Sequence, residues 1–175
     1  YISNASSGKM ARALVAAAKQ LGARVEYIDA ATSVDKLKRN VLKAFPSADA
    51  LIMAAAVSDY RPRKSFAQKI KSGADRLILE LERTPDILGA LGKKKKKQKL
   101  IGFCLETRDL LANARAKLKK KNLDLIVANT PAALGAEDNQ ATLVYANGRV
   151  ERLPKMSKIN LAEQVLAEIC RSFSK

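Results

Sequence analysis

The sequence contains no histidine and no tryptophan, and only two cysteines, Cys104 and Cys170, among 175 residues. Without histidine the chain cannot build a Ser-His-Asp triad, a histidine general base or a histidine-containing zinc site. Two thiols make no disulfide framework, and an all-cysteine zinc site needs four thiolates. Catalysis by this chain would therefore rely on carboxylates, lysines, amides or a metal ion that arrives with a substrate.

Long apolar runs are also missing. The longest covers residues 50–57, which is far too short to span a bilayer, and we read no charged-then-apolar leader. Apolar residues still make up 47% of the chain, enough for one domain with a full core. We expect a single domain over residues 1–175, a cytoplasmic location and no membrane partner.

Acidic residues are outnumbered by basic ones, 17 to 33, which gives a formal net charge of +16. Such a surplus suits nucleic acid or small, multiply phosphorylated substrates, or it is simply a solvated surface. The shortage of aromatic side chains argues against base stacking on single strands. We assign the lysine run at residues 93–97 to an exposed loop without a chemical role, because adjacent like charges repel one another.

A polar segment at residues 3–9 directly precedes the first predicted helix. A helix N-terminus leaves backbone N–H groups unpaired and attracts anions, and Gly8 allows a ligand to approach the backbone. The segment therefore either caps the helix through Ser6 or Ser7, or it binds a phosphate. The apolar face predicted for this helix consists of Met10, Leu14, Ala17 and Leu21.

Strand and helix patterns alternate along the rest of the chain, which is typical of an α/β fold with a parallel sheet. Strands are predicted at residues 24–29, 50–57, 77–81, 100–104 and 123–129. Helices are predicted from a cap at Thr32 or Ser33, from a cap at Thr84, over residues 109–121, and over residues 157–173 with Ile159 facing inward. Asn147-Gly148 predicts a hairpin turn between strands at residues 142–146 and 149–153.

These elements predict a doubly wound, mainly parallel, Rossmann-like sheet with helices on both faces and an antiparallel hairpin near the C-terminus. Such a fold normally begins with a strand before its first anion-binding loop. We therefore expect that an N-terminal strand and its loop are missing from the chain. Ligands bind beyond the carboxyl ends of the strands in such sheets, where Asp59 and Phe103 lie. Taken alone, Asp59 could equally start a turn, and Phe103 could belong to the core.

Several segments, in order, resemble signatures of the phosphopantothenoylcysteine synthetase family. Residues 3–10 are similar to its Ser-Asn-x-Ser-Ser-Gly-Lys-Met motif nearly letter for letter. Further similar segments are Ala-Ala-Val-x-Asp-Tyr at 55–60, Lys-Ile-Lys at 69–71, Thr-Pro-Asp-Ile at 84–87, Gly-Phe-x-x-Glu-Thr at 102–107 and Lys-x-x-x-Lys-Asn-x-Asp at 117–124. The chain departs from the family pattern at Ala11, Ser72 and Thr130, where glycine, lysine and aspartate are usual.

The resemblance implies a ligase that activates the carboxylate of 4′-phosphopantothenate with CTP and joins it to the amine of cysteine. It implies Mg²⁺ carried by the triphosphate, a homodimer, and a flavin-dependent decarboxylase as a fused or partner protein, with no nucleic acid as partner. The implied catalytic residues are Asn4 and Lys69. The implied nucleotide-binding residues are Ser6, Ser7, Gly8, Lys9, Ala55, Ala56, Asp59, Lys69, Pro85, Asp86, Ile87, Leu88, Phe103, Lys117 and Lys121.

Two alternatives come from other functional classes. A Rossmann-type oxidoreductase is disfavoured because the chain has no Gly-x-Gly-x-x-Gly motif. A basic nucleic-acid-binding module is suggested by the net charge alone.

Overall fold

A five-stranded sheet forms the centre of the computed structural model, which describes residues 7–29, 33–64, 68, 76–131 and 138–173. Its strand order is β1 (Ala50–Met53), β4 (Lys99–Leu105), β5 (Leu125–Asn129), β7 (Ala141–Tyr145) and β8 (Val150–Arg152). The first three strands run parallel, whereas β7 and β8 are antiparallel to their neighbours. The α/β fold with a mainly parallel sheet and a C-terminal hairpin is thus confirmed.

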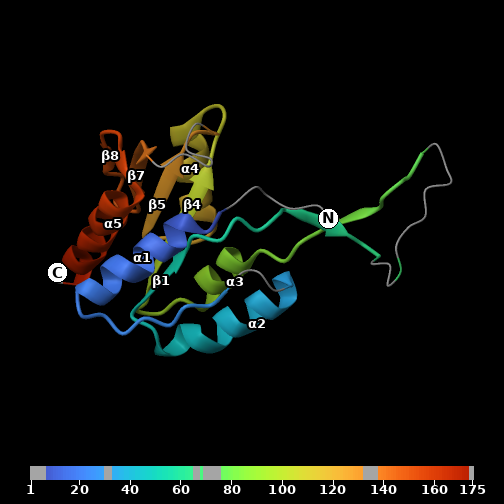
Figure 1. Ribbon diagram of the computed structural model, residues 1–175, viewed down its shortest axis with the longest axis horizontal. Coiled ribbons are helices and arrows are strands. Elements are labelled where there is room, and N and C mark those ends of the chain that lie inside the picture. Colours follow the sequence, from blue (N-terminus) through green and yellow to red (C-terminus); the bar gives the residue numbers. More distant parts are fainter. Residues whose placement is uncertain (1–6, 30–32, 65–67, 69–75, 132–137, 174–175) are drawn as a thin grey trace.

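Helices cover both faces of this sheet (Figure 1). On one face, α1 (Lys9–Gln20) and α5 (Lys158–Phe173) pack together over β4, β5 and β7. On the other face lie α2 (Val34–Ala44), α3 (Ile87–Lys94) and α4 (Leu110–Lys120). Strand β5 supplies both cores, because Leu125 and Val127 face α5 while Ile126 and Ala128 face α4. This burial on both faces explains its uninterrupted apolar sequence.

Several predicted boundaries were wrong. Residues 24–29 form no strand, and the strand predicted over residues 50–57 ends at Met53. Residues 77–80 form no strand, so that only Leu81 of that predicted segment belongs to one. Leu21 and Ile159, both expected in the core, have exposed fractions of 61% and 58%. Each lies at the end of a helix, where the apolar stripe no longer reaches the sheet.

Helix caps also differ in part from the prediction. Ser33 caps α2 as expected, because its Oγ accepts a hydrogen bond from the Lys36 N–H at 3.3 Å. Asp86, not Thr84, caps α3, and its carboxylate accepts a hydrogen bond from the Gly89 N–H at 3.0 Å. Thr84 instead donates its hydroxyl hydrogen to the Ser58 carbonyl, so it ties the two chain segments together. Serine and aspartate are both favoured at the N-cap position of a helix.

The lysine run at residues 93–97 is not simply an exposed loop. Its first two residues close α3, where positive charge suits the helix dipole. The side chain of Lys95 is only 12% exposed, and its Nζ lies 2.9 Å from Asp124 Oδ2. The same carboxylate oxygen accepts a hydrogen bond from the Leu100 N–H at 2.7 Å. Asp124 therefore joins the segment before β4 to the start of β5, and Lys95 has a structural role.

A two-stranded arm projects from the body of the protein (Figure 1). It consists of β2 (Tyr60–Pro62) and β3 (Leu81–Arg83), which pair antiparallel. Arg61 holds the base of the arm, because its guanidinium forms ion pairs with Asp35 of α2 and Glu82 of β3. A second small ladder pairs β6 (Asp138–Asn139) with β9 (Met156–Ser157). A short 3₁₀ helix spans Phe45–Ser47. None of the described helices has the length and apolarity needed to cross a bilayer.

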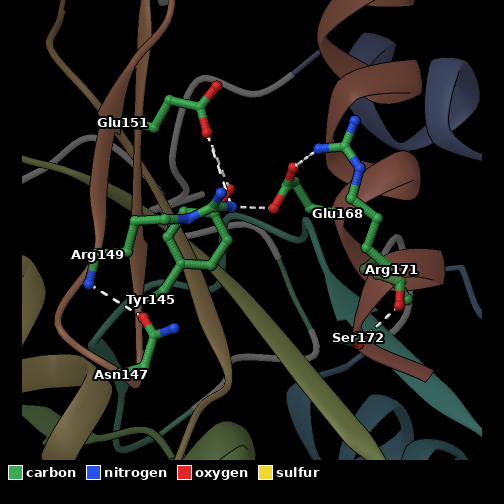
Figure 2. Close-up of polar contacts among 8 residues, drawn as sticks. Tyr145, Asn147, Arg149, Glu151, Glu168, Arg171 and Ser172 are labelled. Atoms are coloured by element: carbon green, nitrogen blue, oxygen red, sulfur yellow. Dashed lines mark hydrogen bonds and ion pairs between the residues drawn. The ribbon is translucent and has the colours of Figure 1, made fainter. Parts of the chain in front are cut away.

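A polar cluster fastens the β7–β8 hairpin to α5 (Figure 2). Glu168 of α5 has a side chain only 7% exposed and forms ion pairs with Arg149 and Arg171. The Arg149 guanidinium also stacks over the Tyr145 ring, 3.8 Å from its centroid. Burial opposes ionisation of Glu168, but contacts with Tyr145 and the two arginines outweigh it and lower its pKa.

We predict that Glu168→Gln lowers the free energy of unfolding by about 1–3 kcal/mol at neutral pH, because charge-assisted hydrogen bonds are lost in a buried site. Urea denaturation followed by circular dichroism measures the change. A carboxylate with a lowered pKa stabilises the fold above its ordinary pKa, and this stabilisation disappears as pH falls through the lower, folded-state value. The difference between wild type and variant should therefore narrow in acid.

The matched control is Glu151→Gln, which removes a carboxylate that is 41% exposed and contacts the same arginine. Exposed pairs contribute less than about 1 kcal/mol, so this variant should remain close to wild type. Equal losses in the two variants would contradict the role given to Glu168.

Candidate functional site

The first helix, α1, begins at a glycine turn. Gly8 is the N-cap residue with φ of 67°, a left-handed conformation that favours glycine. Glycine has no side chain with which to cap the helix, and the Ser7 Oγ accepts a hydrogen bond of 3.4 Å from the Lys9 N–H. Arg12 donates to the Ser7 carbonyl at 2.8 Å and so fixes the turn from within the helix. Of the two serines considered as helix caps, Ser7 is not the N-cap, because Gly8 holds that position, and Ser6 lies outside the described residues.

Residues 54–58 connect the carboxyl end of β1 to Asp59. Ala55 is partly buried against the core beneath α2 and α3, so a small side chain lies next to the strand end. The Asp59 carbonyl accepts a hydrogen bond from the Thr84 N–H at 3.0 Å. This bond places the segment containing Asp59 beside the segment that starts α3. Two motifs that are separate in the sequence, at residues 55–60 and 84–87, thus adjoin each other.

The start of α3 meets the C-terminal end of α4 through an ion pair. Asp86 Oδ1 lies 2.9 Å from Lys121 Nζ, while the same carboxylate caps α3 at Gly89. Burial opposes ionisation of Asp86, but the Gly89 N–H and the Lys121 ammonium outweigh it and lower its pKa. Of the neighbouring predicted residues, Ile87 is buried and Leu88 packs partly against the same core. Ile87 therefore has a packing role, whatever its backbone contacts.

Lys117, one turn earlier on α4, contacts a carboxylate at the end of β4. Its Nζ lies 2.6 Å from Glu106 Oε1, and the Glu106 side chain is 12% exposed. Partial burial disfavours the ammonium, yet the hydrogen bond and charge of Glu106 prevail and raise the pKa of Lys117, with a smaller contribution from Asp59. Burial raises the pKa of the adjacent Cys104 thiol to about 11, so this cysteine is neutral at physiological pH.

The described site residues fall into two groups on opposite faces of the sheet. Asp86, Lys117 and Lys121 lie on the face of α3 and α4, where Lys121 pairs with Asp86 and Lys117 pairs separately with Glu106. Phe103 packs partly against the core under α1 and α5, the face on which Gly8 begins its helix. A ligand touching both groups would have to cross the carboxyl end of the parallel strands, the usual ligand position in such sheets. Asn4, Ser6 and Lys69 lie outside the described residues.

A close contact between α3 and α4 sets the position of Lys121. A Cβ atom added to Gly92 would lie 2.0 Å from the Lys121 carbonyl oxygen, so only glycine allows this approach. Asn122 has φ of 52° and donates from Nδ2 to the Gly92 carbonyl at 2.9 Å. Sequence reasoning missed Gly92 and Asn122, because each depends on a contact between separate elements. The Lys-Asn pair at 121–122 was the only signal.

Metal-binding side chains do not gather in the described part of the chain: no group of three or more aspartates, glutamates and cysteines could hold an ion there. Two carboxylates of the site, Asp86 and Glu106, are instead paired with lysines. This arrangement suits an anionic ligand that brings its own counterion more than it suits a resident metal centre.

Comparisons with known proteins show which sequences and structures this chain resembles. A profile of the family described as "DNA/pantothenate metabolism flavoprotein C-terminal domain" matches residues 1–173. The chain is 41% identical over 188 residues to "Coenzyme A biosynthesis bifunctional protein CoaBC" of Bacillus subtilis (strain 168), and the match covers 97% of this chain but 46% of that protein. The chain thus spans about half the length of this curated relative.

Solved structures show the same fold. The crystal structure of the C-terminal domain of a protein named CoaBC has 32% identity and a TM-score of 0.78, and the match covers 97% of this chain and 84% of that one. A mutant of Cab2 in complex with phosphopantothenate-cysteine has 23% identity and a TM-score of 0.62, over 81% of this chain and 50% of that one. At that identity the second likeness shows the fold alone.

We predict that Gly92→Ala destabilises the protein by about 1–3 kcal/mol, because the new methyl group forces α3 away from the end of α4. In an open helix the same change would stabilise by up to about 1 kcal/mol, so the sign itself is diagnostic. Thermal and urea unfolding measure it. Lys93→Ala, at an exposed neighbouring position, serves as the control and should change stability by less than about 0.5 kcal/mol. A stabilised Gly92→Ala variant would refute the close contact.

Proposed function

The chain belongs to the DNA/pantothenate metabolism flavoprotein C-terminal domain family, and on this premise we propose that it is a phosphopantothenate–cysteine ligase of coenzyme A biosynthesis. We propose further that residues 1–175 form its single ligase domain. The observation that carries the proposal is the pair of carboxylate-held lysines: Lys117 contacts Glu106 at the end of β4, and Lys121 contacts Asp86 at the start of α3. They lie in the motif that the family uses to contact a nucleotide.

The proposed reaction has two halves. The carboxylate of 4′-phosphopantothenate attacks the α-phosphate of CTP and expels pyrophosphate, which gives an acyl-cytidylate. The cysteine amine then attacks the acyl carbon, releases CMP and forms the amide. Neither half requires a histidine, which agrees with the composition. Charge accumulates on phosphoryl oxygens, so positioning and electrostatic stabilisation provide most of the catalysis.

Two residues carry the chemistry in this proposal. Lys69 neutralises the triphosphate during the first half, and Asn4 donates a hydrogen bond to the acyl-phosphate or its tetrahedral successor in the second. The turn at Gly8 supplies backbone N–H groups to phosphate oxygens, and the first helix adds its positive end. Mg²⁺ enters as part of the nucleotide substrate. CTP is preferred over ATP because Lys117 and Lys121 match the bacterial form of the family.

Pyrophosphate release tests this proposal directly. We expect release from CTP with Mg²⁺ and 4′-phosphopantothenate, weaker release from ATP, and amide formation only after cysteine is added. Asn4→Asp should still release pyrophosphate but block the amide, because aspartate cannot donate the hydrogen bond. Lys69→Ala should slow the first half by about 100- to 1,000-fold, as for other lost charge donors at a transition state.

Mass spectrometry of the products separates the two halves of the reaction. Normal amide formation by Asn4→Asp would remove that residue from the mechanism. A wild-type chain that releases no pyrophosphate from either nucleotide would contradict the ligase proposal as a whole.

We also propose that the protein is a homodimer joined through its arm, and that it works beside a flavin-dependent decarboxylase, fused or separate. Consecutive apolar side chains on the segment that leads into β3 of the arm support the dimer: Leu77, Ile78 and Leu79 have exposed fractions of 61%, 89% and 43%. Isolated exposed apolar residues are ordinary, but a continuous apolar segment on a projecting arm is typical of an interface.

The dimer proposal predicts that Leu77→Ser combined with Ile78→Ser shifts the protein from dimer to monomer in sedimentation experiments at micromolar concentration. Ile159→Ser is the control, since Ile159 is 58% exposed but lies on α5, away from the arm. A wild-type protein that sediments as a monomer, or a double variant that remains dimeric, would contradict this interface.

A further inference from the structure

We propose that Glu106 is a positioning residue of the nucleotide site, which together with Asn113 holds the ammonium of Lys117 at the carboxyl end of β4. This inference rests on the proposed nucleotide-binding role of Lys117. It adds two residues that do not themselves have to touch the ligand.

The backbone at Glu106 is fixed by the sheet. Its N–H donates to the Asn129 carbonyl at 2.9 Å, which extends the β4–β5 pairing by one residue. The side chain is 12% exposed, so most of the carboxylate has been removed from water. A mostly buried carboxylate is costly unless its oxygens are hydrogen-bonded, and here both have partners. Oε1 accepts from Lys117 at 2.6 Å, and Oε2 accepts from Asn113 at 3.0 Å.

Asn113 fixes the carboxylate from the helix side. It lies four residues before Lys117 on α4, so the two side chains share one face of the helix. Its Nδ2 donates both to Glu106 Oε2 and to the Arg108 carbonyl, each at 3.0 Å. The orientation of the carboxylate is thus determined by the strand end, the loop after it and the helix. The Lys117 ammonium therefore contacts a carboxylate whose orientation is fixed.

The consequence for Lys117 is a restricted side chain whose charge is compensated. A free lysine loses much rotamer freedom when it binds a ligand, and a lysine already held in place loses less. Lys117 remains 45% exposed, and Glu106 occupies one of the three N–H donors of its ammonium, so donors remain for a ligand. The pair therefore offers a directed hydrogen-bond donor instead of an uncompensated positive charge.

The sign of one substitution separates positioning from simple electrostatics. Glu106→Gln removes a negative charge from a site for an anion, so electrostatics alone predicts tighter nucleotide binding. A positioning role predicts weaker binding, because Lys117 loses its anchor. We expect the Kd for CTP with Mg²⁺, measured by titration calorimetry on the full chain, to rise about three- to tenfold. The KM for CTP should rise in parallel, with kcat changed less.

A double-mutant cycle with Lys117→Met tests whether Glu106 acts through Lys117. Once Lys117 is removed, Glu106→Gln should change the Kd by less than about twofold, since no ammonium is left to position. Asn113→Ala provides a second route to the same carboxylate from an exposed position and should weaken binding in the same direction. Ser33→Ala is the control, because it removes the cap of α2, lowers stability and lies outside the site. Its Kd should equal that of wild type.

Each outcome has a definite meaning. Unchanged or tighter binding by Glu106→Gln overturns the inference, and so does an equal loss in the Lys117→Met background. A loss by Ser33→Ala as large as that by Glu106→Gln would assign the effect to stability and also overturn it. A wild-type chain that binds no nucleoside triphosphate would refute this inference and the proposed nucleotide site together. A wild type that binds CTP without forming the amide would refute only the ligase step.

Discussion

The parallel pairing of β4 with β5 is the interaction on which the rest of the structure depends. The register runs from Ile101↔Leu125 to Leu105↔Asn129, and both strands are buried by helices on each face. Asp124 secures the start of this pair, since its carboxylate accepts from the Leu100 N–H and contacts Lys95. At the other end, the hydrogen bond from Glu106 to Asn129 sets where the chain leaves the sheet. The strand pair therefore determines the position of the Glu106 carboxylate.

The two lysines of α4 derive their positions from different neighbours. Lys117 is held from the strand side through Glu106, whereas Lys121 is held from the helix side through Asp86 and the contact at Gly92. Glu106 directly follows β4 and Asp86 directly precedes α3. Each carboxylate is therefore positioned by a packed strand or helix. Groups fixed in this way hold a ligand more accurately than groups on mobile segments. Placement of these two lysines on this face thus follows from core packing.

The sequence predicted the architecture because its signals are local. The apolar strands, the Asn147-Gly148 turn and the four-residue spacing of Lys117 and Lys121 each need only neighbouring residues to be recognised. The fold class and the family were confirmed on this basis. Residues 24–29 show the limit of such signals: they have the composition of a strand but form none, since a strand exists only where another strand pairs with it.

The partners within the site could not be predicted, because they are separated in sequence. Asp86 and Lys121 are 35 positions apart, and nothing near Gly92 indicates that the Lys121 carbonyl lies against it. Lys95 is the clearest case, since a run of like charges indicates a solvated surface and yet one member is mostly buried against Asp124. A run of like charges predicts exposed side chains on average. A single nearby carboxylate can nevertheless determine whether an individual lysine is buried.

The net charge of +16 and the lysines of the site therefore do different things. Exposed lysines such as Lys93 and Lys94 contribute to a long-range field that attracts anions and that weakens as ionic strength rises. Lys117 and Lys121 contribute little to that field, because Glu106 and Asp86 offset their charges. These two lysines instead have ammonium groups held in fixed orientations. Salt screens such short-range contacts far less than it screens the long-range field. Long-range attraction of anions and the fixed direction of these two side chains are consequently properties of separate sets of residues.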